Sequence, residues 1–332
     1  MTQRNSMRKL NSPVLFLIFN RPDTTKRVFE EIRRAKPERL YVAADGPREN
    51  VREDAELCEA AREVVKDIDW DCHVQTLYRE KNYGCKVAPS SAITWFFEHE
   101  PEGIVLEDDC VPHPAFFGFC SELLDHFRHD ERIMMISGSN HLNRWKDDRQ
   151  SYHFSTGGAW GWASWRRAWA HYDIDMKRWI DPEARRALRS MLVDRRLLRS
   201  DERVFRKTYE GEIDTWDYQW RFARLINSGL TVTPSRNLIS NIGFRSDGTH
   251  TRRQGSALAN LPVYDMDFPL KHNPVVALDQ EYVKRAFDVI QPRLARRIWN
   301  RLNRQFKAFR QAVSHPFLPT DDFRSSDDQI QA

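Results

Sequence analysis

The sequence predicts an α/β protein with a mostly parallel central sheet and helices on both of its faces. Apolar runs of strand length alternate with amphipathic helical segments over residues 13–140. Strands joined through helices pair in parallel, because the helix carries the chain back across the sheet. The chain has 332 residues, of which 40% are hydrophobic and 30% charged. This length suits one large domain with an appendage.

The alternation begins with the run PVLFLIFN, residues 13–20, which has the length and composition of a buried strand. A helix is predicted over 21–36, with Asp23 as its N-cap and an apolar stripe of Val28, Phe29 and Ile32. Further strands are predicted over 39–47, 73–80, 103–109 and 132–140, and further helices over 52–68, 86–99 and 114–130. Pro89 is expected to break the helix over 86–99 in its first turns.

The pattern changes from Trp145 onward. Six of the eleven tryptophans lie between Trp145 and Trp179. Helical segments are predicted over 182–206 and 210–229, and strand-like segments within 230–244. We therefore divide the chain into a flexible N-terminus (1–12), a main domain (13–273) with halves 13–144 and 145–273, and a C-terminal helical extension with a tail (274–332).

The cysteines number five, an odd count, and none forms a CxxC pair. Such usage in a chain of this size indicates reduced thiols and a cytosolic compartment, and no cluster of Cys and His has the spacing of zinc ligands. The longest apolar run is far shorter than the ~18–20 residues of a membrane span. No secretory signal is evident. We therefore expect a cytoplasmic protein.

Three carboxylates stand in a row in the stretch GIVLEDDCVPHP, where Glu107, Asp108 and Asp109 directly follow an apolar strand. Like charges crowded at the edge of a core are costly unless something offsets them. Carboxylates bind hard cations such as Mg²⁺ and Mn²⁺, and Mg²⁺ sites commonly combine one or two of them with substrate phosphates. The acids therefore favour a metal and phosphate site, and the alternative is a solvated loop after the strand.

Polar side chains also follow the neighbouring predicted strands. Asn20 and Arg21 follow the first strand, and Asp45 follows the second. In open α/β sheets, ligands bind outside the carboxyl ends of the strands. These residues are therefore expected to share one site with the three acids.

Seven segments together resemble the GT-A fold glycosyltransferases, and they are most similar to the N-acetylglucosaminyltransferase I-like group. GIVLEDDCVPHPAFFGFC resembles the metal-binding segment of that group. The other six, in chain order, are FLIFNRPDTTKRVFEEI, YVAADGP, KNYGCKVAPSSAITWFF, GGAWGWASW, TWDYQW and LISNIGFRSDGTH. The resemblance covers residues 13–255, and it extends to bacterial proteins of surface-polysaccharide clusters that share this domain. It implies that 13–144 is the nucleotide-sugar-binding half and 145–273 the acceptor and catalytic half.

The resemblance implies roles for the donor side of the site. Asp109 would be the direct metal ligand, with Mn²⁺ or Mg²⁺ as the cation, and Glu107 and Asp108 would support it and hold ribose or sugar hydroxyls. Asp45 would accept a hydrogen bond from the base, with uracil favoured, and Arg21 would lie near the base or the phosphates. The remaining donor-binding candidates are Asn20, Lys86, Arg245 and His250, the last two in the loop that closes over the donor in the family. Ser90 stands where the family has a donor-contacting histidine, so the donor sugar is left open.

The acceptor side depends on two further segments. Asp217 in TWDYQW would be the general base, although the family has two adjacent acids between the tryptophans and only one remains here, so Asp214 is the alternative. Trp160 and Trp162 follow two glycines and are candidates for the sugar site, because aromatic faces stack on sugars, with packing as the equal alternative. Trp165 and Trp169 are assigned to packing.

These expectations define a metal-dependent, inverting glycosyltransferase. It would move a sugar from a nucleotide diphosphosugar, with a UDP-sugar favoured, to a saccharide or lipid-linked glycan acceptor in surface-polysaccharide biosynthesis. A sugar-nucleotidyltransferase is one alternative, but it needs a Gly-rich basic loop after the first strand, and FNRPDTT has no glycine. A glycan-binding module that has lost its chemistry is the other, and the intact acid triplet argues against it.

The C-terminal extension is expected to contain a basic amphipathic helix. Its apolar positions are Leu294, Ile298, Leu302, Phe306, Phe309 and Val313. Residues 293–310 include seven Arg or Lys and no acid. The helix either packs on the domain as a charged face or lies on the anionic inner face of the cytoplasmic membrane, which we prefer. Nucleic acid is not expected as a partner, because no recognised binding motif accompanies the charge.

Overall fold

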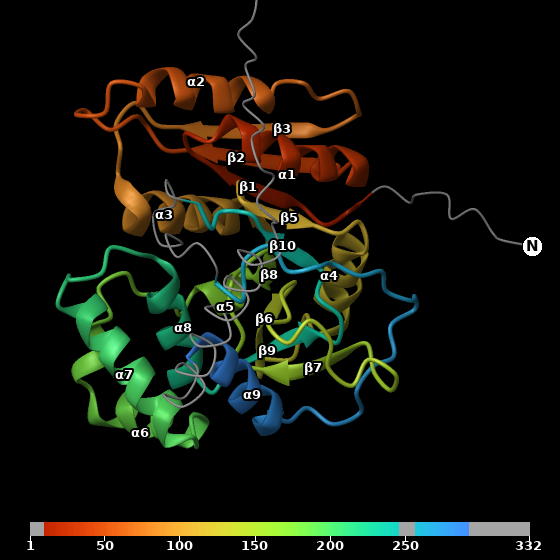
Figure 1. Ribbon diagram of the computed structural model, residues 1–332, viewed down its shortest axis with the longest axis vertical. Helices are drawn as coiled ribbons and strands as arrows, with labels where there is room; N and C mark the ends of the chain where they lie inside the picture. The colour runs from red at the N-terminus through yellow and green to blue at the C-terminus, as the bar shows by residue number, and fades with distance from the viewer. Residues whose placement is uncertain (1–9, 246–255, 292–332) are drawn as a thin grey trace, which may run out of the picture. The chain divides into compact units, whose positions relative to one another are not determined.

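The structure is a computed structural model that describes residues 10–245 and 256–291. The described residues up to Ile290 belong to one compact unit. An eight-stranded sheet of order β3-β2-β1-β4-β8-β6-β9-β7 forms its centre (Figure 1). Its strands are β1 (Val14–Ile18), β2 (Arg39–Ala44), β3 (His73–Tyr78), β4 (Glu102–Glu107), β6 (Ile133–Ser137), β7 (Tyr152–Ser155), β8 (Trp162–Trp165) and β9 (Leu230–Pro234). The predicted α/β class is therefore confirmed.

The helices occupy the segments between the strands. They are α1 (Pro22–Ala35), α2 (Asp54–Val64), α3 (Gly84–His99), α4 (Ala115–His126), α5 (Arg166–Trp169), α6 (Pro182–Met191), α7 (Arg195–Tyr209), α8 (Asp217–Ile226) and α9 (Gln280–Ile290). A 3-10 turn, η1 (Lys177–Ile180), precedes α6. The predicted helices and strands of residues 13–140 are all present, with ends that differ by a few residues.

Two local predictions were wrong. Arg21, not Asp23, is the N-cap of α1, because Pro22 takes the first helical position, where its missing N–H costs nothing. Pro89 does not break α3, which runs from Gly84 to His99 with the proline inside it. The buried side chains of Ala92, Phe96 and other residues of α3 anchor this helix to the sheet, and that packing outweighs the local preference.

The first half of the sheet is parallel, as expected. β1 pairs in parallel with both β2 and β4, and β2 pairs in parallel with β3. Strand β8 lies in the tryptophan-rich segment, where no strand is predicted from the sequence. This strand enters between β4 and β6 and is antiparallel to both. Beyond it, β6 and β9 pair in parallel, and β7 pairs antiparallel with β9 at the edge.

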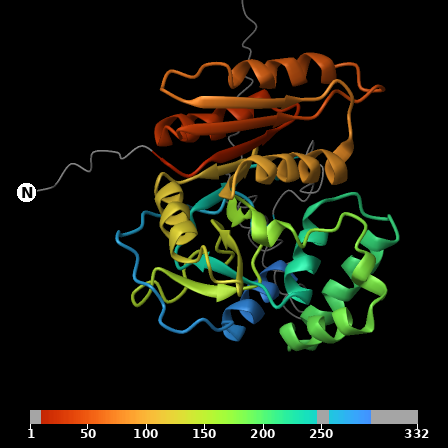
Figure 2. The same ribbon diagram turned by 180° about the vertical axis from the view of Figure 1, so that it is seen from behind.

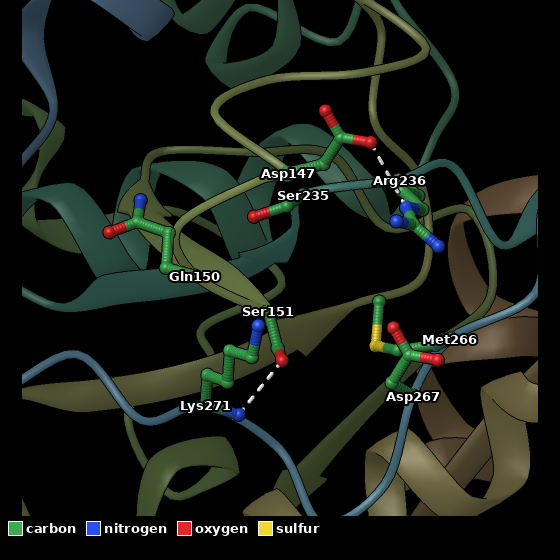
Figure 3. A pocket seen from close by; sticks show the side chains of 8 residues that line it. All are labelled: Asp147, Gln150, Ser151, Ser235, Arg236, Met266, Asp267 and Lys271. Atoms are coloured by element: carbon green, nitrogen blue, oxygen red, sulfur yellow. Dashed lines mark hydrogen bonds and ion pairs between the residues drawn. The ribbon is translucent and has the colours of Figure 1, made fainter.

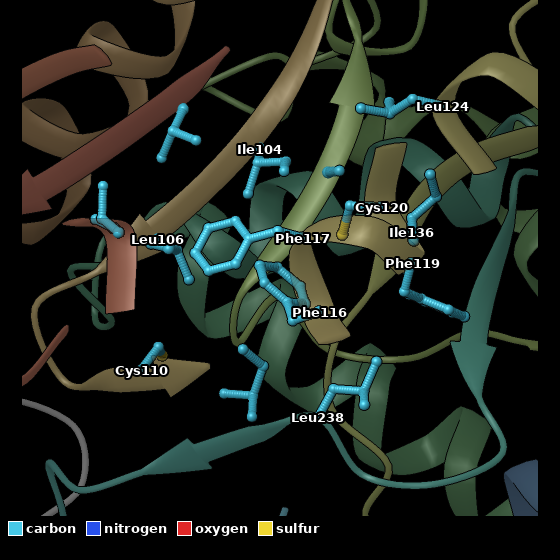
Figure 4. Close-up of a cluster of buried hydrophobic side chains, with 14 of the residues drawn as sticks. Ile104, Leu106, Cys110, Phe116, Phe117, Phe119, Cys120, Leu124, Ile136 and Leu238 are labelled. Carbon is cyan, nitrogen blue, oxygen red and sulfur yellow. The ribbon is translucent and has the colours of Figure 1, made fainter. Parts of the chain in front are cut away.

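Each face of the sheet carries its own hydrophobic cluster, because alternate residues of a strand point to opposite faces. Phe16 and Val42 pack with α1, α2 and α4 on one face, part of which Figure 4 shows around Phe116 and Leu238. Leu15 and other residues of β1, β2 and β4 pack with α3, α5 and α8 on the opposite face, as the two opposed views show (Figures 1 and 2). Both faces are therefore covered, which fits the burial of the central strands β1, β2 and β4, whereas the edge strand β3 is partly exposed.

A third cluster lies among η1, α6, α7, α8 and α9. Trp179, Phe205 and Phe222 form its aromatic centre. Tyr282 of α9 packs on His153 of β7, and Asp279 just before α9 accepts a hydrogen bond from Trp145 at 2.9 Å. Residues 274–290, assigned above to the C-terminal extension, thus belong to the same compact unit as the sheet. The basic helix expected over 293–310 lies outside the described residues.

All five cysteines are free thiols, and Cys58, Cys110 and Cys120 are buried. None of the helices in residues 10–245 and 256–291 combines the length and the hydropathy that crossing a bilayer requires.

Candidate functional site

The three acids stand where β4 leaves the sheet. Glu107 is the last residue of β4 and pairs with Leu17 of the parallel neighbour β1. Asp108 and Asp109 form the turn that follows, and both are buried. Because parallel strands end at the same edge, this register brings the segment after β1 to the acids. The backbone N–H of Phe19 donates to Asp108 Oδ2 at 3.3 Å.

Arg21 is the counter-ion of these acids. Its Nη1 lies 3.1 Å from Asp109 Oδ2, and its Nη2 forms an ion pair with Asp108. Burial alone would lower the pKa of Arg21, but the charges of Asp108 and Asp109 raise it above its ordinary value. The guanidinium therefore stays charged, and it offsets the acids from a neighbouring strand end. The sequence analysis expects Asn20, Arg21 and the acids at one edge, and the structure brings Arg21 and the acids into contact.

Glu107 is the acid that Arg21 does not hold. Its side chain makes no hydrogen bond or ion pair with any residue of 10–245 or 256–291, and it is partly exposed. Burial and the charges of Asp109, Asp217 and Asp108 raise its pKa well above the ordinary value. Asp217, the first residue of α8, thus lies close enough to act on Glu107, although the two are far apart in the sequence. The expected general base and the expected metal site are therefore within electrostatic reach of each other.

The alternative base, Asp214, lies near the same group of acids. A Cβ on Gly84, at the start of α3, would come within 3.2 Å of Asp214 Oδ2. Both Asp214 and Asp217 contribute, with Glu107, to the raised pKa of the Cys85 thiol, whose largest cause is burial. Asp217 accepts a hydrogen bond from Thr215 Oγ1 and stands at the positive end of the α8 dipole. Proximity alone therefore does not choose between the two acids.

Asp45 has a structural role at the end of β2. Its carboxylate accepts hydrogen bonds from the backbone N–H groups of Gly46, Tyr83 and Gly84 at 3.0–3.1 Å and from Asn82 Nδ2 at 3.0 Å. These donors use the roughly four lone-pair positions of a carboxylate. They also tether the start of α3 to the sheet. Recognition of the base by Asp45 stays a prediction, and it would require one of these donors to be shared or released.

Asn20 leads to two residues that the sequence analysis misses. Asn20 Nδ2 donates to Asp54 Oδ1 at 2.8 Å, and Arg48 holds the same carboxylate with Nε at 2.5 Å and Nη2 at 2.8 Å. Asp54 is only 1% exposed. Arg48 also lies over the ring of Phe19, 5.5 Å from its centroid. An acid in the first turn of α2 is an ordinary helix-start signal, so nothing in the sequence distinguished Asp54.

A short two-stranded ribbon brings a late segment to the acids. β5 (Cys110–Pro112) pairs antiparallel with β10 (Ile239–Asn241). The N–H of Ile242 donates to the carbonyl of Asp109 at 2.8 Å, and a Cβ on Gly243 would come within 2.1 Å of Asp109 Oδ2. The carboxylate of Asp109 therefore lies directly against the backbone at Gly243. Only glycine leaves room for this contact.

Of three further donor-binding candidates, the structure describes two, Arg245 and Lys86. Arg245 forms an ion pair with Asp23 of α1, and the side chains of both residues are largely exposed. Lys86 lies in the first turn of α3, where its carbonyl accepts from Ser90 Oγ at 2.6 Å. His250 lies outside the described residues. Contact of these residues with phosphate stays a prediction.

The two candidate tryptophans of the sugar site differ sharply. Trp162 is fully buried in β8, where it stacks on Trp216 with ring centroids 5.7 Å apart. No face of this ring is open to a sugar, so its assignment to the sugar site is corrected to packing. Trp160 is half-buried and contacts His141 and Phe244. It remains the candidate, and the assignment of Trp165 and Trp169 to packing is confirmed by their burial.

Two arginines of α8 hold the backbone before β8, and the sequence analysis did not single them out. Arg224 is buried and donates to the carbonyl of Gly157 at 3.0 Å. Burial and the nearby charge of Arg221 lower the pKa of Arg224 to about 9, and Asp217 opposes that shift. Arg221 pairs with Asp201 of α7 at 2.7 Å and donates to the carbonyl of Thr156 at 2.5 Å. Two guanidinium groups of α8 therefore hold the backbone of the glycine segment, residues 156–158, through its carbonyl groups.

The donor atoms at this edge suit a hard divalent cation. The carboxylates of Glu107 and Asp109 supply oxygen, which Mg²⁺ and Mn²⁺ prefer, and the side chain of Glu107 forms no hydrogen bond or ion pair among the described residues. In residues 10–245 and 256–291, no three His, Cys, Asp or Glu side chains converge as a complete ligand set. A site completed by substrate phosphates needs only one or two protein carboxylates. The residues therefore fit a cation that is bound together with a diphosphate.

A pocket elsewhere in the molecule is separate from the acids. Figure 3 shows it beside β7 and β9, with Asp147 and Arg236 paired at 3.0 Å on its wall. Its other lining residues are Gln150, Ser151, Ser235, Met266, Asp267 and Lys271. None of the residues expected in the site lines this pocket.

Comparison with known proteins finds similarity of structure only. No protein-family model matches the chain, and no curated protein matches it. Among solved structures, a UDP-glucose pyrophosphorylase complexed with UDP-glucose matches with a TM-score of 0.36 and 7% identity, over 70% of this chain and 93% of that one. HddC from Yersinia pseudotuberculosis matches with a TM-score of 0.28 and 10% identity, over 47% and 77%.

The inositol-1-phosphate CTP transferase from T. maritima matches with a TM-score of 0.28 and 9% identity, over 49% of this chain and 74% of that one. All three TM-scores are below 0.5, so these similarities decide nothing about the reaction. The resemblance to the N-acetylglucosaminyltransferase I-like group also stays a prediction. The class of this protein is therefore defined by its own fold: an α/β protein with a group of acids where β4 leaves the sheet.

Proposed function

We propose that this protein is a metal-dependent, inverting glycosyltransferase that uses a nucleotide diphosphosugar, with a UDP-sugar favoured. The observation that carries the proposal is the set of charges at one edge of the sheet, where Arg21 pairs with Asp108 and Asp109 and the charge of Asp217 acts on Glu107. An acceptor hydroxyl needs a base within reach, and a leaving diphosphate needs cations. Asp217 supplies the first, and Arg21 lies where it can contribute to the second.

In this proposal the acceptor hydroxyl attacks the anomeric carbon of the donor, and Asp217 takes the hydroxyl proton. The bond between that carbon and the diphosphate oxygen breaks, so the nucleoside diphosphate leaves with the added negative charge. Arg21, released from part of its contact with Asp109, would pair with that charge. Trp160 would lie against the sugar, and Arg221 and Arg224 would fix the glycine segment that precedes it.

A divalent cation held by Asp109 and Glu107 would neutralise the diphosphate and lower the barrier to its departure. The acceptor would be a saccharide or a lipid-linked glycan in surface-polysaccharide biosynthesis. Asp214 remains the alternative base. These assignments rest on the resemblance of the motifs and on the way the described residues meet.

A sugar-nucleotidyltransferase is the second candidate, because such an enzyme also uses an α/β sheet with acids at the strand ends, and here Glu107, Asp108 and Asp109 stand at the end of β4. In that reaction a sugar 1-phosphate attacks the α-phosphate of a nucleoside triphosphate and releases pyrophosphate. Such enzymes hold the triphosphate on a glycine-rich loop after the first strand. Here only Phe19, Asn20 and Arg21 separate β1 from α1, and none is glycine. The short connection favours glycosyl transfer.

A binding experiment tests the proposal. UDP is titrated calorimetrically into the protein with and without Mn²⁺, for the wild type, Asp109→Asn and the control Asp148→Asn, whose side chain is 75% exposed. We expect Mn²⁺ to tighten UDP binding at least tenfold in the wild type and the control but not in Asp109→Asn. If UDP and other nucleoside diphosphates do not bind with or without metal, the proposal fails.

A product assay separates the two candidates. A panel of nucleotide sugars is incubated with Mn²⁺ and saccharide acceptors, and release of the nucleoside diphosphate is followed. In parallel, nucleoside triphosphates are incubated with sugar 1-phosphates, and pyrophosphate is followed. Release of pyrophosphate without release of a nucleoside diphosphate would establish the second candidate in place of the first.

A further inference from the structure

Helix α7 carries an exposed row of arginines that no part of the proposed reaction uses. Arg195, Arg199, Arg203 and Arg206 are all exposed, at spacings of four, four and three residues. Residues at such spacings lie on one face of a helix. The opposite face, with Leu197, Phe205 and Thr208, is buried against the rest of the unit. At 1.5 Å per residue the row is roughly 16 Å long.

The charge of this row is only partly offset by acids in the part of the chain that the structure describes. No ion pair joins the four arginines to any acid in residues 10–245 or 256–291. Of the acids of α7, Asp201 pairs with Arg221, whereas Glu202, 3.7 Å from Arg189, lies at helical spacing from Arg199 and Arg206 and offsets part of their charge. Glu210 and Glu212, both exposed after α7, offset the charge at that end, where Arg206 acts on Glu212.

The surroundings of the row are basic and partly apolar. Residues 177–207 contain eleven Lys or Arg against five Asp or Glu. Val193, in the turn before α7, is 66% exposed, and Ile180, just before α6, is 68% exposed. Figure 1 shows α6 and α7 beside α8 in one lobe (green). Exposed apolar side chains that are close in sequence to a group of cations are a feature of surfaces that meet another protein or a bilayer.

We propose that α7 and the turn before it form a docking surface for an anionic phospholipid bilayer. The arginine row would lie over the lipid phosphates, and Val193 and Ile180 would enter the headgroup boundary. A nucleic acid would attract the same charge, but it offers no apolar phase to these two side chains. The proposal concerns α7 alone and does not depend on the basic residues 293–310.

The surface is linked to the candidate site through one ion pair. Asp201 of α7 holds Arg221 of α8 at 2.7 Å, and α8 begins at Asp217. A protein docked through α7 would therefore hold the helix of the expected base at the bilayer. An acceptor carried by a lipid would be delivered to that helix without leaving the membrane.

Vesicle sedimentation of the full chain tests the proposal. Vesicles of phosphatidylcholine are compared with an equal mixture of phosphatidylcholine and phosphatidylglycerol, at low and high salt. The row variant is Arg195→Gln, Arg199→Gln, Arg203→Gln and Arg206→Gln in one chain. The control, of equal charge change, is Lys26→Gln, Arg27→Gln, Lys36→Gln and Arg52→Gln, which are also exposed. The basic residues 293–310 are present in every variant and contribute equally to partition. The effect of the row is therefore measured as the difference in partition between variants.

The wild type should partition onto the anionic vesicles, and high salt should release it. Each basic residue near an anionic surface is worth about fivefold in partition, so four of them would multiply to about 600-fold, and we expect the row variant to lose at least thirtyfold. The control should stay within twofold of the wild type. Partition of the row variant within twofold of the wild type, or an equal loss in the control, would overturn the proposal.

Two further variants test the apolar contact and guard against misfolding. Val193→Ser should weaken partition about three- to tenfold, whereas Val275→Ser, at a position that is 62% exposed, should not. If the quadruple variant fails to fold, Arg199→Glu alone replaces it in the test. This single variant should reduce partition at least tenfold. Binding to a duplex oligonucleotide that depends on the row, without row-dependent binding to vesicles, would replace the bilayer with nucleic acid as the partner.

Discussion

Arg21 Nη1 lies 3.1 Å from Asp109 Oδ2, which joins the segment after β1 to the turn after β4. The same guanidinium pairs with Asp108, so one cation offsets two buried acids. With Glu107 ionised, the group of one cation and three acids still carries two negative charges. An added cation, or a proton on Glu107, would reduce that excess. The raised pKa of Glu107 has this excess as one of its causes.

Replacement of Arg21 should destabilise the protein. Arg21→Met leaves Asp108 and Asp109 buried without a counter-ion, which typically costs ~3–5 kcal/mol. Urea unfolding at neutral pH measures the loss. The combination of Arg21→Met with Asp108→Asn should recover part of it, because one of the two uncompensated charges is gone. If Arg21→Met alone were as stable as the wild type, the ion pairs would not exist in solution.

The two candidate bases should separate in kinetics. Asp217→Asn should lower kcat by about 10²–10⁴-fold and leave donor binding unchanged, since a general base acts only in the chemical step. Asp214→Asn should lower kcat less than tenfold. Steady-state transfer assays and UDP titrations provide both quantities. The reverse order of effects would assign the base to Asp214.

Gly243→Ala should disturb the acid site directly. The new Cβ would come within 2.1 Å of Asp109 Oδ2, so either the carboxylate or the backbone must move. We expect loss of at least tenfold in Mn²⁺-dependent UDP affinity by calorimetry. Gly158→Ala is the control, because the nearest atom to its Cβ would be His141 Cε1 at an ordinary 3.8 Å. Equal losses in both variants would show that the contact with Asp109 is not the cause.

The corrected assignment of Trp162 gives opposite expectations for two tryptophans. Trp162→Ala removes a fully buried ring and should lower the free energy of unfolding by roughly 3–5 kcal/mol. Trp160→Ala should cost less stability but raise the KM for the donor or acceptor severalfold, because the half-buried Trp160 is the ring left to meet a sugar. Unfolding curves and steady-state kinetics of both variants decide this. A Trp162→Ala variant as stable as the wild type would restore the original assignment.

A buried histidine should make the protein sensitive to mild acid. Burial lowers the pKa of His153 to about 3, and both its ring nitrogens lack a hydrogen-bond partner among the described residues. In the unfolded state the imidazole of His153 binds a proton near the ordinary histidine pKa of about 6.5, whereas in the native state it stays neutral at that pH. The contribution of His153 to the free energy of unfolding is therefore fully present above pH ~6.5. Below that pH it falls by up to ~1.4 kcal/mol per pH unit.

Between pH ~6.5 and ~4, the slope of the unfolding free energy against pH reports how many protons are taken up on unfolding. His153→Leu should lower that number by about one. His141, whose pKa burial lowers to about 4, should maintain part of the slope. The control His129→Gln replaces an exposed histidine and should leave the slope unchanged. Urea unfolding across this pH range supplies the comparison. An unchanged slope in His153→Leu would contradict the burial of a neutral ring.

The parallel half of the sheet could be predicted because its signals are local. Apolar runs of strand length and helical stripes such as Val28, Phe29 and Ile32 depend on residues a few positions apart. The tryptophan-rich segment could not be resolved, because large aromatic residues suit a strand, a helix or a binding site equally. Trp162 lies in β8 because its ring fills a space between Trp169, Trp216 and Trp220, residues that the chain supplies later.

By itself, the sequence determined which strand end carries the acids, since a buried strand that stops at three carboxylates is a local pattern. Only the tertiary structure decided what lies against them. Arg21, Gly243 and Asp217 reach the acids through strand pairing, the β5–β10 ribbon and the packing of α8. The physical reason is that charge acts over a few ångströms in space, and distance along the chain does not reveal which groups will share that space.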